Sequence, residues 1–192
     1  FYSGTHFHTT WEAKRNENFE LRDPYMINVP ADDQPVRFSA ESISAETVDF
    51  DLSPYKDKVK VVEIMGSWCP NCHDATEFLK SWKEENPNLP VEIISLAFER
   101  YEDPEKSLEI LRTYREDSGI SWPVVYGGSL SEAGNSPYAF LIDEIKAYPT
   151  FILLDQENRI RNILTGFYGP ATSEYDSFRD KFDQGVREAM EP

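Results

Sequence analysis

The sequence predicts an α/β fold with three layers (α/β/α), in which a mixed β-sheet lies between helices. Apolar runs of strand length alternate with segments whose apolar residues recur at helical spacing, a pattern typical of parallel β-α-β units. Near the end of the chain two apolar runs follow each other without a helix, which predicts one antiparallel pair. The expected order is β-α-β-(α-β)-α-β-β-α, carried by a domain at residues 36–192.

The composition is that of a folded protein with a large acidic excess. The 192 residues include 35 Asp or Glu and 19 Lys or Arg, which argues against nucleic acid or an anionic membrane as a partner. No apolar run reaches transmembrane length, so no membrane-spanning segment is predicted. The chain begins at Phe1 rather than Met, and we expect a processed or truncated form that has lost any signal or lipid anchor.

Residues 1–35 are interpreted as an appendage, the tail of a larger N-terminal region. From Phe1 to Trp11, small or polar residues alternate with aromatic ones, which predicts an exposed strand or hairpin. The proline-bounded run at residues 30–35 indicates a turn at the entry to the domain. The domain then opens with a predicted β-hairpin at residues 36–53.

The strand predicted at Val59–Met65 is almost continuously apolar, which indicates burial on both faces. Glu63 is the exception to this apolar character in the middle of the run. A carboxyl group in that position is expected to be desolvated, with a raised pKa. Glu63 is therefore a candidate to carry protons to and from a group nearby.

Both cysteines of the chain lie where this strand gives way to a helix. Cys69 and Cys72 form a C-x-x-C, Pro70 suits a first helical turn, and apolar residues at helical spacing follow at Ala75, Phe78, Leu79 and Trp82. Unpaired N–H groups and a partial positive charge at the helix start favour a thiolate, so Cys69 is the expected attacking sulfur. Cys72 is placed to resolve a mixed disulfide on Cys69. The pattern predicts a dithiol–disulfide exchanger whose redox centre is the Cys69–Cys72 pair, with no bound cofactor or metal.

Beyond this helix the chain predicts further strands and helices. An internal strand is expected at Val91–Phe98, and a helix that opens at Asp103 and Pro104 follows it. A short strand at Trp122–Tyr126 is expected to end at the glycine pair 127–128, and a loop of small residues to span 129–136.

The last third of the chain is expected to complete the sheet and one helical layer. Tyr138, Phe140, Leu141 and Ile145 suggest a helix. An antiparallel hairpin is predicted from Phe151–Leu154 and Ile160–Leu164, and an amphipathic helix from about residue 175 closes the chain.

Glu63 through Cys72 resembles the active-site segment of thioredoxins, in which an acidic residue lies six positions before the first Cys of W-C-x-x-C. Ala147-Tyr148-Pro149-Thr150, placed just before a strand, is similar to the cis-proline turn of the same superfamily. The resemblance implies that Pro149 packs against the disulfide and that Tyr148 faces it. It also assigns Trp68, Pro70 and Asn71 to the rim that meets a substrate.

Within this superfamily the chain resembles the TlpA/ResA group of thiol–disulfide oxidoreductases, in a form typical of Bacteroidetes. The N-terminal hairpin and a strand–helix–strand insert at residues 99–126 match that group, although the group usually has Asn where Glu63 stands. The resemblance implies a periplasmic or other extracytoplasmic disulfide reductase, membrane-anchored through a missing N-terminus. Its partners would be protein thiols and disulfides and an upstream electron donor, for example in cytochrome c maturation.

Two other functions are compatible with the same residues. Cys69 to His73 also spells C-x-x-C-H, the attachment motif of c-type haem, which would make the chain an electron carrier with His73 as axial ligand. A non-catalytic binding or metal-delivery protein of the same fold is the second alternative, because soft thiolates suit Cu(I).

Overall fold

The computed structural model describes residues 2–6, 9–13, 16, 34–135, 137–138, 141 and 145–191. At the N-terminal end, β1 (Tyr2–His6) and β2 (Thr9–Ala13) pair antiparallel as a hairpin, as the alternating pattern predicts. The proline-bounded turn predicted at residues 30–35 lies largely outside the described residues. Within the described part of the chain, no helix is long and apolar enough to cross a membrane.

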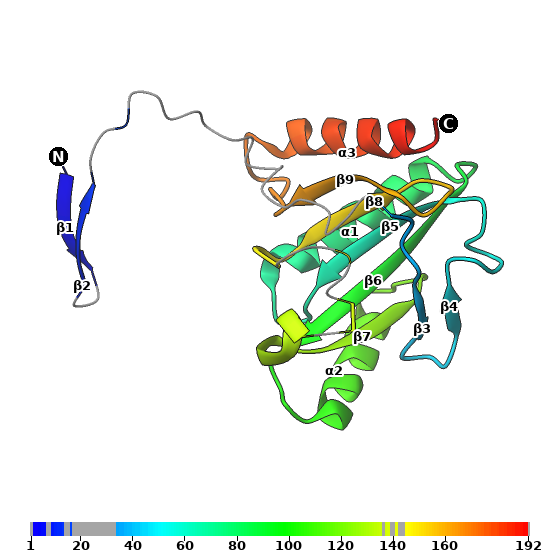
Figure 1. The fold of residues 1–192 in the computed structure, drawn as a ribbon, viewed down its shortest axis with the longest axis horizontal. Coiled ribbons are helices and arrows are strands. Elements are labelled where there is room, and N and C mark those ends of the chain that lie inside the picture. The colour runs from blue at the N-terminus through cyan, green and yellow to red at the C-terminus, as the bar shows by residue number, and fades with distance from the viewer. Residues whose placement is uncertain are drawn as a thin grey trace.

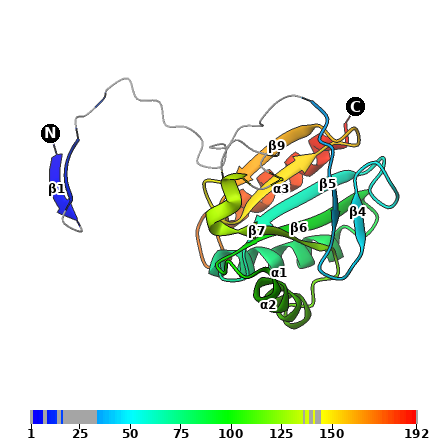
Figure 2. The same cartoon turned by 60° about the horizontal axis from the view of Figure 1, so that its bottom comes forward.

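A five-stranded mixed sheet forms the centre of the domain (Figures 1 and 2). Its strand order is β7-β6-β5-β8-β9. The strands are β5 (Val59–Met65), β6 (Val91–Glu99), β7 (Val124–Ser129), β8 (Thr150–Leu154) and β9 (Ile160–Thr165). Strands β5, β6 and β7 run parallel, whereas β8 pairs antiparallel with both β5 and β9. The predicted α/β class and mixed sheet are confirmed.

The three α-helices of the described residues pack on one face of this sheet, as Figure 2 shows. They are α1 (Pro70–Glu85), α2 (Pro104–Asp117) and α3 (Tyr175–Ala189). In β5, Val59, Val61 and Met65 join their apolar cluster, while Val62 and Ile64 belong to a second cluster on the opposite face. The alternation of a strand therefore divides one apolar run between two cores.

The second face carries the short hairpin of β3 (Ser39–Glu41) and β4 (Thr47–Asp49) together with the 3₁₀ helix η1 (Leu130–Asn135). Tyr138 and Leu141 also pack there. The helix predicted around these two residues lies largely outside the described residues, which omit 136, 139–140 and 142–144. Residues 129–135 do not form the predicted loop, because Ser129 ends β7 and η1 follows directly, while residue 136 lies outside the described residues.

The prediction that β7 ends at the glycine pair is wrong. The strand runs from Val124 to Ser129 through both glycines, and its register against β6 shifts between Ala97 and Phe98. A Cβ atom on Gly127 would lie 2.8 Å from the Phe98 ring, and Gly128 has a φ of +126°. The glycines therefore form a bulge beside an aromatic side chain, so the usual turn signal misleads here.

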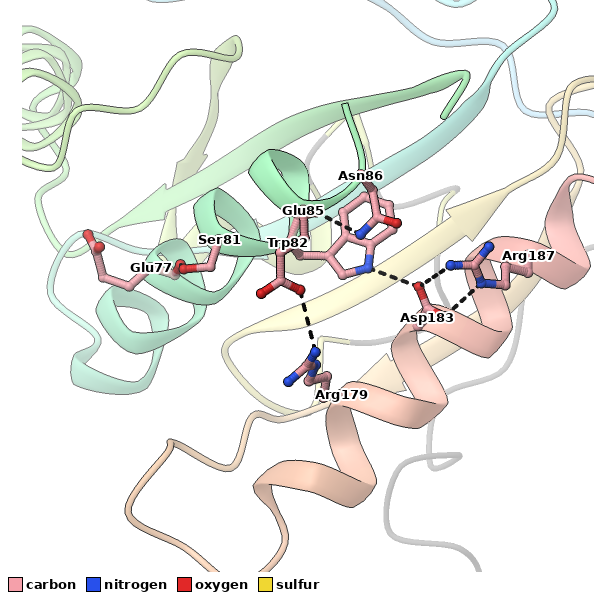
Figure 3. Close-up of polar contacts among 8 residues, drawn as sticks. All are labelled: Glu77, Ser81, Trp82, Glu85, Asn86, Arg179, Asp183 and Arg187. Atoms are coloured by element: carbon pink, nitrogen blue, oxygen red, sulfur yellow. Dashed lines mark hydrogen bonds and ion pairs between the residues drawn. The ribbon is translucent and has the colours of Figure 1, made fainter. Parts of the chain in front are cut away.

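Helices α1 and α3 are joined by a polar cluster beside their apolar contact (Figure 3). The indole Nε1 of Trp82 donates to Asp183 Oδ1 over 3.2 Å, and Arg187 Nε donates to Asp183 Oδ2 over 2.7 Å. At the neighbouring turn, Arg179 forms an ion pair with Glu85 at 3.4 Å. These contacts fix the helix that carries the cysteines against the C-terminal helix.

Candidate active site

The two cysteines occupy the beginning of α1, next to the end of the central strand β5. Cys69 is the N-cap residue and Pro70 the first residue of the helix, and Cys72 lies within the first turn. Both thiols are free; Cys69 is 6% exposed and Cys72 is fully buried. Cys69 alone of the two reaches the surface, between the exposed Pro70 and the cis-proline turn. A protein partner can therefore meet Cys69 first.

The turn before β8 lies against this thiol. The peptide bond between Tyr148 and Pro149 is cis, and Cys69 Sγ donates to the carbonyl oxygen of Tyr148 over 3.5 Å. The Trp68 ring meets the Tyr148 ring edge-on, with centroids 5.3 Å apart. Burial, followed by the charges of Cys72 and Cys69, raises the pKa of the Tyr148 hydroxyl. Trp68, Tyr148 and Pro149 thus gather around Cys69, while Asn71 is exposed on the first turn of the helix.

Glu63 lies completely buried on the helix side of β5. Oε2 accepts a hydrogen bond from Ser95 Oγ at 2.7 Å, and Oε1 has no partner among the described residues. Burial raises the pKa of Glu63 to about 7, although the Ser95 hydrogen bond opposes the rise. The carboxyl group can therefore take up and release a proton near neutral pH.

Cys72 is held as a thiol by its surroundings. Burial is the largest cause of its raised pKa, and the hydrogen bond with Cys69 and the negative charge of Glu63 act in the same direction. The helix side of the sheet thus holds Cys69, which is 6% exposed, together with the fully buried Cys72 and Glu63, all three of which the sequence had singled out.

A second buried carboxylate supports the loop before Cys69 and was not a predicted site residue. Glu99, at the end of β6, is 1% exposed and receives two hydrogen bonds from Ser67, one from its N–H at 2.8 Å and one from its Oγ at 2.9 Å. Burial raises the pKa of Glu99. The sequence offered only an indirect signal, an acidic residue at the carboxyl end of an internal strand.

The same loop needs a glycine for the indole to pack close to the chain. Trp68 Nε1 donates to the carbonyl oxygen of Phe98 over 2.9 Å. A Cβ atom on Gly66 would lie 2.3 Å from that nitrogen and 2.8 Å from that oxygen. The guanidinium of Arg100 lies 4.5 Å from the centre of the Trp68 ring. Gly66 therefore permits the position of the tryptophan beside the site.

The haem alternative does not fit these residues. A thioether on Cys72 would have to form inside the core, where this side chain has no exposed surface. The imidazole of His73 already has other contacts. Its Nε2 lies 2.7 Å from the carbonyl oxygen of Ser67, and its ring packs edge-to-face against Tyr114. As for metal delivery, no group of three or more His, Cys, Asp or Glu residues that could hold an ion occurs in the described part of the chain.

Solved structures with the same fold cover most of the chain. A secreted thiol-disulfide isomerase from Corynebacterium glutamicum superposes with a TM-score of 0.63 at 17% identity, covering 91% of this chain and 99% of its own. StoA from Bacillus subtilis gives 0.56 at 17% identity, with 81% and 99% covered. A thiol-disulfide oxidoreductase from Bacteroides fragilis gives 0.56 at 20% identity, with 78% and 97% covered. At these identities the likeness establishes the fold alone.

The sequence itself matches one family. No curated protein sequence matches the chain. The family model for Redoxin matches residues 30–177, which include the C-x-x-C and the turn at Pro149. The match confirms the predicted superfamily and the predicted class of thiol–disulfide oxidoreductase. The chain belongs to the Redoxin family.

Proposed function

We propose that the protein is an extracytoplasmic protein-disulfide reductase in which Cys69 attacks and Cys72 resolves. The observation that carries this proposal is the pairing of two unequal thiols at one helix start. Cys69 reaches the surface beside Tyr148, whereas Cys72 is enclosed next to Glu63. An attacking thiol must meet its substrate, and a resolving thiol needs only to reach the first sulfur.

In the first step the Cys69 thiolate attacks one sulfur of a substrate disulfide. A bond forms between Cys69 and that sulfur, the substrate disulfide breaks, and the second substrate sulfur leaves as a thiolate that takes up a proton. The N–H groups at the start of α1 favour the negative charge on the attacking sulfur.

In the second step Cys72 gives its proton to the Glu63 carboxylate and attacks Cys69. The Cys69–Cys72 disulfide forms, and the substrate leaves with both of its sulfurs reduced, so that two electrons pass from protein to substrate. Glu63 suits this exchange because its pKa of about 7 lets it accept the proton near neutral pH. An external dithiol donor must then return two electrons to the protein.

The direction of transfer is proposed from the surroundings of Cys69. Its sulfur donates to a carbonyl oxygen, an acceptor that can bond the thiol but not the thiolate. Strong oxidants of this kind owe their potential to a stabilised reduced form. Because the Tyr148 carbonyl oxygen does not stabilise the Cys69 thiolate, this contact supports the role of a reductant.

The proposed place of action is outside the cytoplasm. It is supported by the resemblance to the TlpA/ResA group, and one structural relative is a secreted thiol-disulfide isomerase. The partners would be disulfide-bonded proteins on one side and a dithiol electron donor on the other.

The decisive test is an equilibrium redox titration of the purified chain in glutathione and dithiothreitol buffers, read by alkylation and mass spectrometry. A potential of about −270 mV would support the reductase, since thioredoxin has this value. A potential of about −120 mV would overturn the proposed direction and make the protein an oxidant. The same spectra count the alkylated thiols, and two in the reduced protein are expected.

A further inference from the structure

A chain of three buried groups leads from the insert to the carboxyl group of Glu63. Trp122, in the segment between α2 and β7, donates from Nε1 to Ser95 Oγ over 2.9 Å. Ser95, paired with Glu63 across the parallel strands β5 and β6, donates in turn to Glu63 Oε2 over 2.7 Å. All three residues are almost completely buried, so water does not compete for these bonds.

The direction of both hydrogen bonds is fixed by chemistry. An indole N–H can only donate, so the Ser95 oxygen must accept from Trp122. Ser95 has one hydroxyl hydrogen, and Glu63 Oε2 is the acceptor that lies in reach of it. Oε2 is then an acceptor even when Glu63 is protonated, which places the carboxylic proton on Oε1. Oε1 is also the oxygen without a partner among the described residues.

We propose that Trp122 and Ser95 are positioning residues that hold Oε2 of Glu63 as a hydrogen-bond acceptor and thereby keep its exchangeable proton on Oε1. This inference rests on the proposed function, in which Glu63 accepts the proton of Cys72. We call the hydrogen-bonded series Trp122, Ser95 and Glu63 the relay. The indole that orients the Ser95 hydroxyl comes from the predicted insert at residues 99–126, so the insert takes part in the chemistry. Ser95 also stabilises the carboxylate, so that a desolvated Glu63 still ionises near neutral pH.

Two ionisable side chains of the described residues respond to the charge of Glu63. Cys72 of α1 and Tyr114 of α2 both have their pKa values raised in part by the charge of Glu63, and Cys69 lies beyond Cys72. Tyr114 is itself hydrogen-bonded to Thr76 at 2.8 Å. From β8, the residue paired with Glu63 is the apolar Phe151. A cation, the ammonium group of Lys83, lies 5.9 Å from the centre of the Trp122 ring.

The test is an infrared titration of the full chain in its reduced form, following the C=O band of the protonated carboxyl group. The band is assigned to Glu63 by its loss in Glu63→Gln. Ser95→Ala should raise the pKa of Glu63 by about one to two units and move the band to higher frequency, because the C=O loses its donor. Trp122→Phe should shift the pKa of Glu63 and the frequency of the band in the same direction, but by less. Ser95→Thr keeps the hydroxyl and should stay near the parent.

A matched control is Thr165→Val, which deletes a buried hydroxyl on β9 that has no hydrogen-bond partner among the described residues. It should leave the band and the titration unchanged. In a Glu63→Gln background, Ser95→Ala should no longer alter the pH profile of disulfide exchange. An unchanged band in both Ser95→Ala and Trp122→Phe would overturn the relay.

The infrared titration uses no substrate, so it separates the two proposals. A shifted titration in a protein that exchanges no disulfides would sink the proposed function and leave the relay standing. Normal disulfide exchange in the parent, together with an unshifted Glu63 titration in the variants, would overturn the relay and leave the proposed function standing. If Ser95→Ala does not fold, Trp122→Phe gives the same decision, because it keeps an aromatic ring in the core and removes the indole N–H.

Discussion

Cys69 Sγ donates a hydrogen bond to the carbonyl oxygen of Tyr148 over 3.5 Å, although the two residues are 79 positions apart in the sequence. This contact ties the start of α1 to the turn before β8. The side chain of Tyr148 packs in addition against Trp68. The backbone of Tyr148 therefore holds the thiol, while its ring forms part of the cover beside it.

Replacement of Tyr148 should separate these two roles. Tyr148→Ala removes the ring but keeps the carbonyl, so we expect Cys69 to be alkylated several-fold faster by iodoacetamide. The lost packing should cost about 1–3 kcal/mol in urea unfolding. Tyr148→Phe keeps the ring and should resemble the parent in both measurements. Equal alkylation rates in all three proteins would show that the ring does not cover the thiol.

The unequal burial of the cysteines predicts which variant retains a substrate. Cys72→Ser should accumulate a mixed disulfide between Cys69 and a disulfide-bonded protein, because the resolving thiol is gone. Cys69→Ser should trap at least tenfold less, since Cys72 has no exposed surface. Non-reducing electrophoresis with mass spectrometry measures both, and Cys69→Ser/Cys72→Ser is the blank. Equal trapping by the two single variants would contradict the assignment of roles.

Buried Glu63 should make the stability of the protein depend on pH. Its pKa is about 7 in the fold against an ordinary value of 4.5, so between these values the folded protein binds more protons than the unfolded chain. The free energy of unfolding should therefore fall as the pH rises through this window, by up to about 3 kcal/mol.

Glu63→Gln removes this titration while preserving the shape and an acceptor for Ser95. We expect this variant to be more stable than the parent at pH 8 and close to it at pH 4.5, measured by urea unfolding of the reduced proteins. If the difference in unfolding free energy between the parent and Glu63→Gln is the same at pH 8 and at pH 4.5, the pKa of Glu63 is not raised.

Local sequence patterns predicted the framework of the site. The apolar run of β5 and the helical spacing after Cys72 are properties of neighbouring residues, and the structure places β5 and α1 where they were expected. The two thiols and the cis-proline turn, which carry their own sequence signals, also came together.

The partners of the buried acids could not be predicted in the same way. Ser95 meets Glu63 only because β5 and β6 pair in one particular register, and Ser67 meets Glu99 just beyond the end of the same pairing. Each pair is separated by 32 residues, and nothing local fixes that register. The end of β7 was wrongly predicted at its glycine pair for a related reason, because the Phe98 ring that packs against the pair lies on another strand.

Glu99 should support the loop that precedes Cys69. Glu99→Ala removes both acceptors from Ser67, so we expect a loss of about 1–3 kcal/mol in stability and faster hydrogen exchange at the Ser67 amide. Glu99→Gln keeps one acceptor and should lose less. Glu102→Gln is the control, because this carboxylate accepts hydrogen bonds from Ser129 and Ser131 instead of Ser67. Unaltered exchange at Ser67 in Glu99→Ala would mean that the loop is held by other contacts.

Asp183 should stabilise the packing of α1 on α3 chiefly through Trp82 (Figure 3). Trp82 is buried, so Asp183→Ala leaves its indole N–H without this acceptor and should cost about 1–3 kcal/mol. Asp183→Asn keeps an acceptor and loses only the solvent-exposed ion pair with Arg187, so it should cost much less. Arg187→Gln should be equally mild.

Asp183 should also make the stability of the protein depend on pH in the acidic range. The hydrogen bond from Arg187 lowers the pKa of Asp183, so the stability it contributes should be present above the ordinary carboxyl range and lost as the pH falls through the lowered value. Urea unfolding between pH 2 and 7 should show this loss in the parent and not in Asp183→Asn. If Asp183→Ala proves no less stable than Asp183→Asn at pH 7, the Trp82 hydrogen bond does not stabilise the helix pair.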